Sequence, residues 1–161
     1  MTELIIERAG VQDADELFEM IRELCVFEKL EHRFLTSAAV LRTHLLGEAM
    51  EALIARIDGS AVGYAVYCRV YHTFSGVWLY LDDLYVRPDN RGSGLGKALL
   101  KRVADVAWDK GYSGIEWMVL DWNTPAVDFY ESIGATVDKD FWTERVSGRD
   151  AIAAFRERVR R

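Results

Sequence analysis

Hydrophobic residues in the first third of the chain change from the spacing of a strand to that of a helix. The run LIIERA at residues 4–9 is short and rich in branched residues, which predicts a strand. Apolar residues then recur every three or four positions, as on one helix face, with Asp13 or Asp15 as the expected cap. A second helix is predicted from a cap at Thr36 to Gly47. The stripe of the first helix comprises Ala14, Leu17, Phe18, Ile21, Leu24 and Cys25.

Strand patterns separated by turn signals fill the middle of the chain, and helices alternate with strands after residue 86. Asp58-Gly59 is a turn signal, Gly111 and Gly134 stand where helices should end, and Thr124-Pro125 combines a cap with a first-position proline. The strand patterns are EALIARIDG, AVGYAVYCRV, VWLYLDDLYV, GIEWMVL and a last one over residues 135–146, and further helices follow Gly94, Thr124 and Ser147. This order predicts one α/β domain, residues 1–161, with a central mixed sheet of six to seven strands flanked by helices.

Composition narrows the class of protein. The net charge of −6 argues against nucleic acid as a partner and suits a cationic small molecule. No apolar run reaches the roughly 18 residues of a membrane span, and the acidic start MTELIIERAG is not a secretory signal. Cys25 and Cys68 lie inside predicted elements, which favours two buried, reduced thiols in the cytoplasm, although their spacing also permits a disulfide.

Three glycines at a strand-to-helix junction, in RGSGLG at residues 91–96, indicate close approach of a ligand to the backbone. The dinucleotide fingerprint would need glycine at Lys97, and the P-loop would need glycine at Arg91 and Ser or Thr at Ala98, so both fail. Bare N–H groups at a helix start favour a phosphate, and Arg91 and Lys97 add positive charge. A plain glycine-rich turn with two solvated cations is the alternative.

The segments LYLDDLYVRPDNRGSGLG, LDWNTPAVDFYESIGA and IRELCVFEK resemble the GNAT acetyltransferase superfamily, and within it the diamine (spermidine/spermine) acetyltransferases. The resemblance runs from near Leu4 to about Trp142 and implies an acetyl-CoA-dependent N-acetyltransferase with a GNAT fold. In this superfamily, the glycine-rich segment holds the pyrophosphate of acetyl-CoA, and the fourth strand presents backbone groups to the pantetheine arm. The cofactor-binding residues that it implies are Leu84, Tyr85, Val86, Arg91, Gly92, Ser93, Gly94, Leu95, Gly96, Lys97, Asn123, Pro125 and Ala126.

The same resemblance implies two catalytic residues. Tyr130 corresponds to the tyrosine that protonates the departing thiolate, although the pattern alone also fits an amphipathic core tyrosine with its hydroxyl at the surface. Asp82 corresponds to a glutamate near the amine that often acts as a base through water, and its shorter stem puts direct contact in doubt. Because neighbours in a regular strand face opposite ways, only one of Asp82 and Asp83 is expected to enter a cleft.

The resemblance also implies an amine-binding end. Glu28, with Phe27 beside it, corresponds to a carboxylate that faces the distal cation of the substrate, and an exposed helix-end glutamate is the alternative. Where polyamine-acetylating relatives carry Tyr-Asp-Pro-Trp, this chain has YHTF, so His72 replaces an acid and weakens the case for polyamines. His32 and His44 lack ligand partners at metal-binding spacing, so no metal site is predicted.

The predicted function is direct acetyl transfer to the primary amine of a small cationic substrate: a diamine, a polyamine or a lysine-like amine. Two alternatives stay open, an acetyltransferase for protein lysines or N-termini and a non-catalytic CoA-binding module. The resemblance further implies a homodimer, for which Trp142, Ile152, Phe155 and Val159 offer apolar surface.

Overall fold

The computed structural model describes residues 3–47, 49–140 and 143–160, which form two compact units. The first unit ends at Met118 and the second begins at Val119. The first contains the sheet, three helices and the core, and the second contains two helices. Each unit is described separately below.

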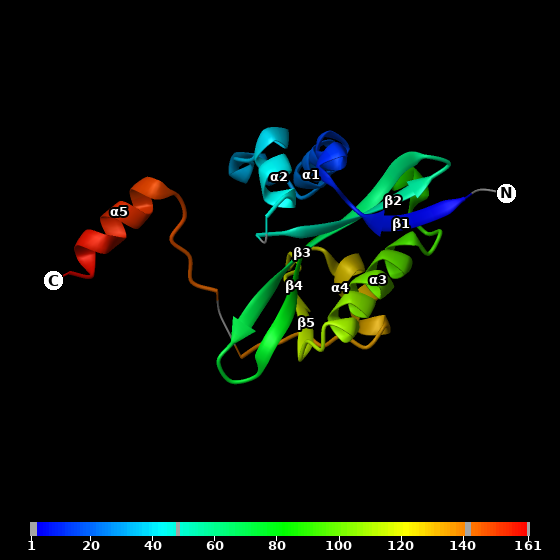
Figure 1. The fold of residues 1–161 in the computed structure, drawn as a ribbon. Coiled ribbons are helices and arrows are strands. Elements are labelled where there is room, and N and C mark those ends of the chain that lie inside the picture. The colour runs from blue at the N-terminus through cyan, green and yellow to red at the C-terminus, as the bar shows by residue number, and fades with distance from the viewer. Residues whose placement is uncertain (1–2, 48, 141–142, 161) are drawn as a thin grey trace. The chain divides into compact units, whose positions relative to one another are not determined.

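The first unit is built on a mixed five-stranded sheet (Figure 1). Its strands follow the chain order and are β1 (Leu4–Arg8), β2 (Glu51–Ile57), β3 (Ser60–His72), β4 (Gly76–Val86) and β5 (Gly114–Trp117). Neighbours from β1 to β4 are antiparallel, and β5 joins β4 in parallel after a helical crossover. Asp58 and Gly59, with φ of 48° and 82°, form the predicted β2–β3 turn. The mixed sheet is confirmed.

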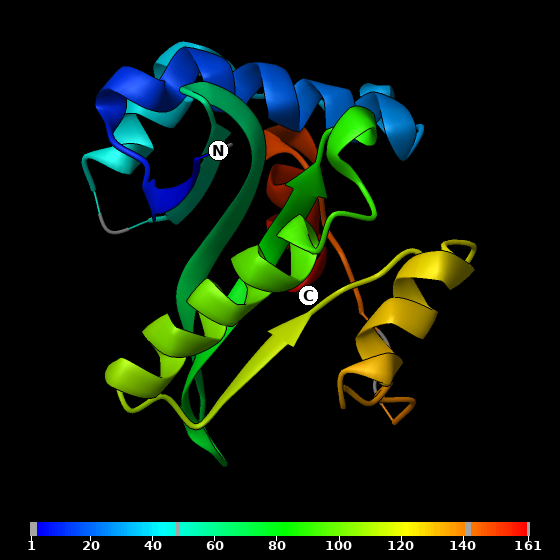
Figure 2. The same ribbon diagram turned by 90° about the vertical axis from the view of Figure 1, so that its right-hand side faces the viewer.

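Helices cover both faces of this sheet (Figure 2). They are α1 (Ala14–Phe27), α2 (Ala38–Leu45) and α3 (Leu95–Asp109), accompanied by 3-10 turns at Val11–Asp13, Glu31–Arg33 and Pro88–Asn90. Leu99 of α3 lies against Gly63 on one face, whereas the adjacent Tyr64 packs under α1 on the other. The α1–α3 pair therefore sandwiches the middle of β3.

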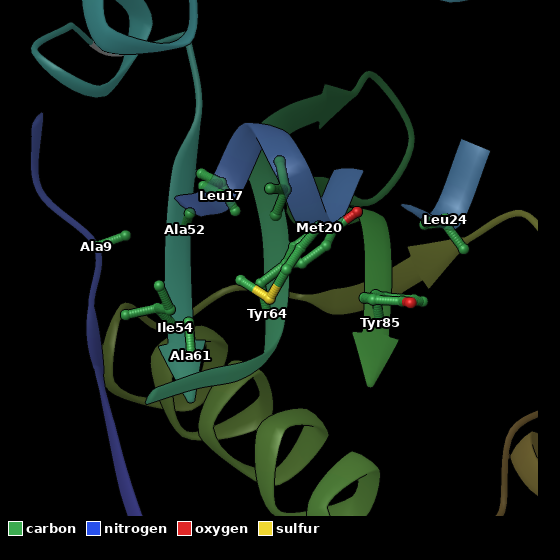
Figure 3. Packing of buried hydrophobic residues seen from close by; sticks show 10 residues of the cluster. Ala9, Leu17, Met20, Leu24, Ala52, Ile54, Ala61, Tyr64 and Tyr85 are labelled. Atoms are coloured by element: carbon green, nitrogen blue, oxygen red, sulfur yellow. The ribbon is translucent and has the colours of Figure 1, made fainter. Parts of the chain in front are cut away.

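The core beneath α1 joins the first helix to three strands. Leu17 and Met20 of α1 are fully buried against Ile54 and Tyr64, and Tyr85 of β4 closes the cluster (Figure 3). The apolar stripe that predicted α1 forms the face that makes these contacts. Residues at the margins of the stripe are half-exposed. This packing places the end of α1 above β4, which is where the candidate site lies.

Local capping differs from the prediction at two helices by one residue. Ser37, not Thr36, caps α2, and its hydroxyl accepts a hydrogen bond from the Val40 N–H at 3.3 Å. Asn123, not Thr124, precedes α4. At α1, Asp13 occupies the cap position, but its carboxylate accepts from the Gly10 N–H and pairs with Arg56 at 2.6 Å instead of capping the helix.

The second unit contains α4 (Thr124–Ser132) and α5 (Arg149–Arg158). The prediction of six to seven strands is wrong for the described residues, where the sheet has five. Residues 135–140 and 143–146, expected to form a last strand, are irregular, and residues 141–142 lie outside the described chain. A strand requires a hydrogen-bonded neighbour, and no described strand pairs with this segment, so its β propensity alone does not produce one.

Candidate functional site

Strand β4 carries a β-bulge at Asp82. Opposite β3, Leu81 pairs with Tyr67, but Asp83 pairs with Val66, so Asp82 is an extra residue. A bulge changes the alternation of side chains along its strand. Leu81 therefore lies on the face of Tyr67, and Asp83 lies on the opposite face with Val66. The expectation that only one aspartate enters a cleft assumed regular alternation, which this bulge interrupts.

The bulge groups three carboxylates, Glu28 from the end of α1 with Asp82 and Asp83 from β4, which we call the acid cluster. Desolvation raises the pKa of Asp83 to about 7, and the charges of Asp82 and Glu28 add to the effect. Desolvation also raises the pKa of Glu28, with a further contribution from Asp82. Asp82 is exposed by surface area, yet its carboxyl is partly desolvated and its pKa is raised. The acid cluster therefore resists carrying three negative charges at once, and a cation would relieve it.

Tyr64 supplies a hydrogen bond to the acid cluster from the strand next door. Its ring is fully buried in β3, and its hydroxyl donates to Asp83 Oδ2 at 3.3 Å. Burial raises the pKa of this hydroxyl well above its usual value, and the charge of Asp83 raises it further. Tyr64 thus stays a donor at neutral pH. Sequence reasoning missed it, although a tyrosine in a buried apolar strand needs a partner for its hydroxyl.

The edge of β4 opens immediately after the bulge. The pairing of β4 with β5 runs from Trp78–Gly114 to Leu81–Trp117, and β5 ends there. Residues 83–86 remain paired with β3 on their other side. Leu84, Tyr85 and Val86, expected to bind the cofactor, lie on this open stretch. The Tyr85 side chain is buried and donates its hydroxyl to Glu23 Oε2 at 2.9 Å, so only its backbone is offered to a ligand.

The glycine-rich loop leads from β4 into α3. Gly92 and Gly94 have φ of 75° and 85°, a region that favours glycine, and Gly94 is the cap residue of α3. A Cβ at either position would meet no atom within 4 Å, so the space in front of both glycines is open. The first turn of α3 contains no acidic residue, and Lys97 is exposed there. Open glycine backbone at a helix N-terminus fits the pyrophosphate of a coenzyme.

Arg91 and Ser93 of the same loop turn their side chains toward the protein. Arg91 Nε donates to the Val86 carbonyl at 2.9 Å. The Arg91 guanidinium lies 5.0 Å from the Phe27 ring centroid and 5.7 Å from that of Tyr85. Ser93 Oγ donates to the Asn90 carbonyl at 2.7 Å. These contacts attach the loop to β4 and to the end of α1. The Arg91 side chain connects the loop with Phe27.

His72, which replaces an acid of the polyamine enzymes, lies at the end of β3. Its Nε2 is 2.9 Å from Glu116 Oε1 of β5, and its ring meets Trp78 edge-on at 5.5 Å between centroids. The adjacent Tyr71 and Phe74 are strongly exposed. Glu116 could not be recognised as a partner from the sequence, because the contact joins two strands that lie far apart along the chain.

In the second unit, α4 carries the other expected residues. Asn123 precedes the helix, and its carbonyl accepts from the Ala126 N–H at 3.0 Å and the Val127 N–H at 3.1 Å. Pro125 lies in the first turn. Tyr130 packs its ring against Phe129, with 5.2 Å between centroids. Gly134, with φ of 97°, ends the helix as predicted.

Both cysteines are free thiols and half-buried, and desolvation raises the pKa of each. Among the described residues, no three His, Cys, Asp or Glu side chains are arranged to hold a metal ion. A search of the same residues found no helix both long and apolar enough to cross a membrane.

Comparison with known proteins gives one consistent result. The acetyltransferase (GNAT) family profile matches residues 14–135. A thialysine N-epsilon-acetyltransferase from Sus scrofa is 41% identical over 145 residues, covering 84% of this chain and 85% of that protein. Spermidine/spermine N(1)-acetyltransferase-like protein 1 from Homo sapiens is 31% identical over 139 residues, covering 81% of this chain and 20% of that protein.

A solved integron cassette protein from the mobile metagenome of V. cholerae superposes with a TM-score of 0.78 at 22% identity, covering 96% of this chain and 98% of that one. At that identity the likeness shows the fold alone. The resemblance predicted from the three sequence segments is confirmed by the family profile and by the relatives. The chain belongs to the acetyltransferase (GNAT) family and is an N-acetyltransferase.

Proposed function

We propose that the protein transfers the acetyl group of acetyl-CoA directly to a primary amine of a small cationic substrate, either a lysine-like amino acid or a diamine. The acid cluster beside the open edge of β4 carries this proposal. Its carboxyl groups are desolvated, and their mutual repulsion disfavours ionisation of all three at once. The Sus scrofa relative, named for acetylating the terminal nitrogen of thialysine, supports an acceptor of this kind.

Electrostatics favour a cation at this place. A carboxylate about 4 Å from an ammonium contributes about 4 kcal/mol at an effective dielectric of 20, before the cost of desolvation is subtracted. Glu28 and Asp82 lie on two different elements, α1 and β4, so a cation between them would gain from both. Phe27, next to Glu28 and 44% exposed, offers an aromatic surface to the aliphatic part of the substrate.

The chain supplies three groups for the coenzyme. The amides of the glycine-rich loop would bind the pyrophosphate, the backbone of residues 84–86 would pair with the pantetheine arm, and the start of α4 (Asn123, Pro125, Ala126) would also contact the coenzyme. Bound acetyl-CoA would supply a thioester whose carbonyl carbon the amine attacks. The family profile spans residues 14–135, which supports a single acetyltransferase domain.

Two side chains have proposed roles in proton transfer. Asp82 accepts a proton from the incoming amine through water, because a lysine-like amine with a pKa near 10.4 must lose a proton before it attacks. Tyr130 donates a proton to the departing thiolate. Burial raises the pKa of the two cysteine thiols, which disfavours a thiolate nucleophile and supports transfer without a covalent acyl-enzyme.

The contact of His72 with Glu116 favours the lysine-like amine over a polyamine. A polyamine would gain from a third carboxylate at the position of His72. The Glu116 carboxylate beside that position is already occupied by the imidazole at 2.9 Å. We therefore expect long polyamines to be poorer substrates than short amines.

An amine panel with acetyl-CoA, followed by release of free thiol, tests the proposal. The panel contains thialysine, lysine, ornithine, putrescine, spermidine and a lysine-containing peptide. The first four should give the highest kcat/KM, and Asp82→Asn should lower it, whereas the exposed control Asp109→Asn should not. Higher turnover of the peptide than of every small amine would refute the proposed substrate class.

Dimerisation and a cytoplasmic location complete the proposal. The apolar residues Ile152 and Phe155 of α5 and its C-cap Val159 are exposed at helical spacing, which supports burial against a second copy. The free thiols of Cys25 and Cys68 suit a reducing compartment. Light scattering at micromolar concentration should give twice the mass of the chain, and a monomer mass would contradict the dimer.

A further inference from the structure

We infer that Tyr64 is a positioning residue of the acid cluster, whose hydroxyl orients Asp83 so that this carboxyl takes over from Asp82 the proton released by the acceptor amine. The inference rests on the proposed function and assigns roles to two residues on adjacent strands. Neither residue was selected from the sequence as catalytic. The hydrogen bond that joins them is a contact of β3 with the bulged part of β4.

The Tyr64 side chain is fixed in place at Asp83. Tyr64 is held rigidly, because its ring is fully buried, packs 5.9 Å from the Tyr85 ring and lies in the core beside Met20 (Figure 3). Its hydroxyl donates a hydrogen bond to Oδ2 of Asp83. A hydrogen bond that holds one carboxylate oxygen in place also sets the direction in which the other oxygen points. Tyr64 thus sets which way Asp83 faces.

The charges of the acid cluster depend on one another. Two ionised carboxylates already disfavour a third, so the acid cluster titrates as a unit with at least one member that exchanges its proton near neutral pH. Asp83 is that member, with a pKa raised to about 7 chiefly by desolvation. The hydroxyl of Tyr64 acts in the opposite direction and lowers this pKa. The ionisable groups that face Asp83 are Asp82, Glu28, Cys25, Tyr64 and Tyr80.

The proton balance gives Asp83 a place in the reaction. An acceptor that arrives as an ammonium ion loses two protons while one C–N bond forms and one C–S bond breaks. One proton ends on the thiol of the product coenzyme, and the other must leave the site. Asp82 receives this second proton through water, and Asp83, a carboxyl that exchanges its proton near pH 7, takes it over from Asp82 before it returns to solvent. Without the Tyr64 hydroxyl, the pKa of Asp83 would be higher. A larger fraction of Asp83 would then already be protonated near neutral pH and unable to accept a proton.

Tyr64→Phe tests the inference while keeping the ring and its packing. The acidic limb of the pH profile of kcat/KM should move to higher pH by roughly half a unit to one unit, as expected for the loss of one hydrogen bond to a carboxylate. Tyr67→Phe is the matched control: Tyr67 is also buried in β3, but it faces the other side of the sheet. Its profile should match the wild type.

Titration of the carboxyl carbons by NMR, with 13C-labelled aspartate, measures the same shift without turnover. Asp83 should titrate at higher pH in Tyr64→Phe than in the wild type and in Tyr67→Phe. In an Asp83→Asn background, adding Tyr64→Phe should cause no further change in the pH profile, which keeps the test valid if the single variant folds poorly.

The outcomes separate the two proposals. An active enzyme whose acidic limb and Asp83 titration are unmoved by Tyr64→Phe overturns the role of Tyr64 and leaves the proposed function standing. A shift of the limb in Tyr67→Phe equal to that in Tyr64→Phe also overturns it. Absence of acetyl transfer to every amine of the panel refutes the proposed function, and with it the catalytic part of this inference.

Discussion

Replacing Asp83 by asparagine should stabilise the protein at alkaline pH, and the size of the effect follows from the acid cluster. The carboxyl of Asp83 is half-buried, and desolvation with its two acidic neighbours raises its pKa to about 7 from 3.8. In the unfolded chain this carboxyl loses its proton near its ordinary pKa. The folded protein therefore binds one more proton between these two values, and its stability falls as pH rises through that window.

The magnitude is about 1.4 kcal/mol for each pH unit between the two pKa values. Full ionisation of Asp83 in the folded state then costs about 4 kcal/mol above pH 8, of which less than half is already present at pH 5. Between pH 5 and pH 8 the wild type should lose about 2–3 kcal/mol relative to Asp83→Asn. Asparagine retains an oxygen that can accept from Tyr64, so the variant keeps the shape of the site.

Urea unfolding at pH 5 and pH 8, followed by circular dichroism, measures this difference. The free energy of unfolding of Asp83→Asn should exceed that of the wild type at pH 8, and the gap should be narrower at pH 5. Asp109→Asn, an exposed carboxylate at the end of α3, should follow the wild type at both pH values. A gap between Asp83→Asn and the wild type that is the same at both pH values would refute the raised pKa.

Three further variants test other parts of the site. Tyr130→Phe should lower kcat by about 100-fold or more and leave coenzyme A binding unchanged in calorimetry, and near-normal turnover would remove the tyrosine as the acid. Gly94→Ala should weaken coenzyme A binding at least tenfold and cost about 1–2 kcal/mol of stability through its positive φ. Gly59→Ala, at a similar φ of 82° in the β2–β3 turn, should cause the same loss of stability with no effect on binding. Glu28→Gln should raise the KM for the amine about tenfold, equivalent to about 1.4 kcal/mol, and an unchanged KM would place the cation elsewhere.

Several elements were predictable because their signals are local. The apolar stripe of α1, the Asp58-Gly59 turn, the terminal glycine of α4 and the closing helix each follow from the properties of neighbouring residues. The glycine-rich loop was identified by position and residue type alone. Errors of one residue at Ser37 and Asn123 arose because several adjacent polar residues could serve as the cap.

The predicted last strand shows the limit of local signals. Residues 135–146 contain branched and aromatic residues, but β structure depends on a neighbouring strand that donates and accepts hydrogen bonds. Within the described chain no strand provides these bonds. The predicted extra strands therefore have no counterpart in the described sheet.

The acid cluster shows the same limit at the site. Glu28 and Asp82 were identified as candidates from the resemblance, whereas regular alternation implied that only one of Asp82 and Asp83 could enter a cleft. The bulge between the pairs Val66–Asp83 and Tyr67–Leu81 interrupts that alternation, and it exists only in the pairing of two strands. Tyr64 and Glu116 were missed for the same reason, since each contacts a residue on another strand.

The amino-acid sequence by itself determined the family, the order of most elements and the loop that suits a pyrophosphate, because these depend on patterns within short segments. Tertiary structure alone decided which carboxylates come together, which of them is desolvated and which hydroxyl holds it in place. Hydrogen bonds and desolvation act between atoms that are close in space, and strand register sets those distances. A single extra residue in β4 thereby changes the chemistry of the site without any distinctive mark in the chain.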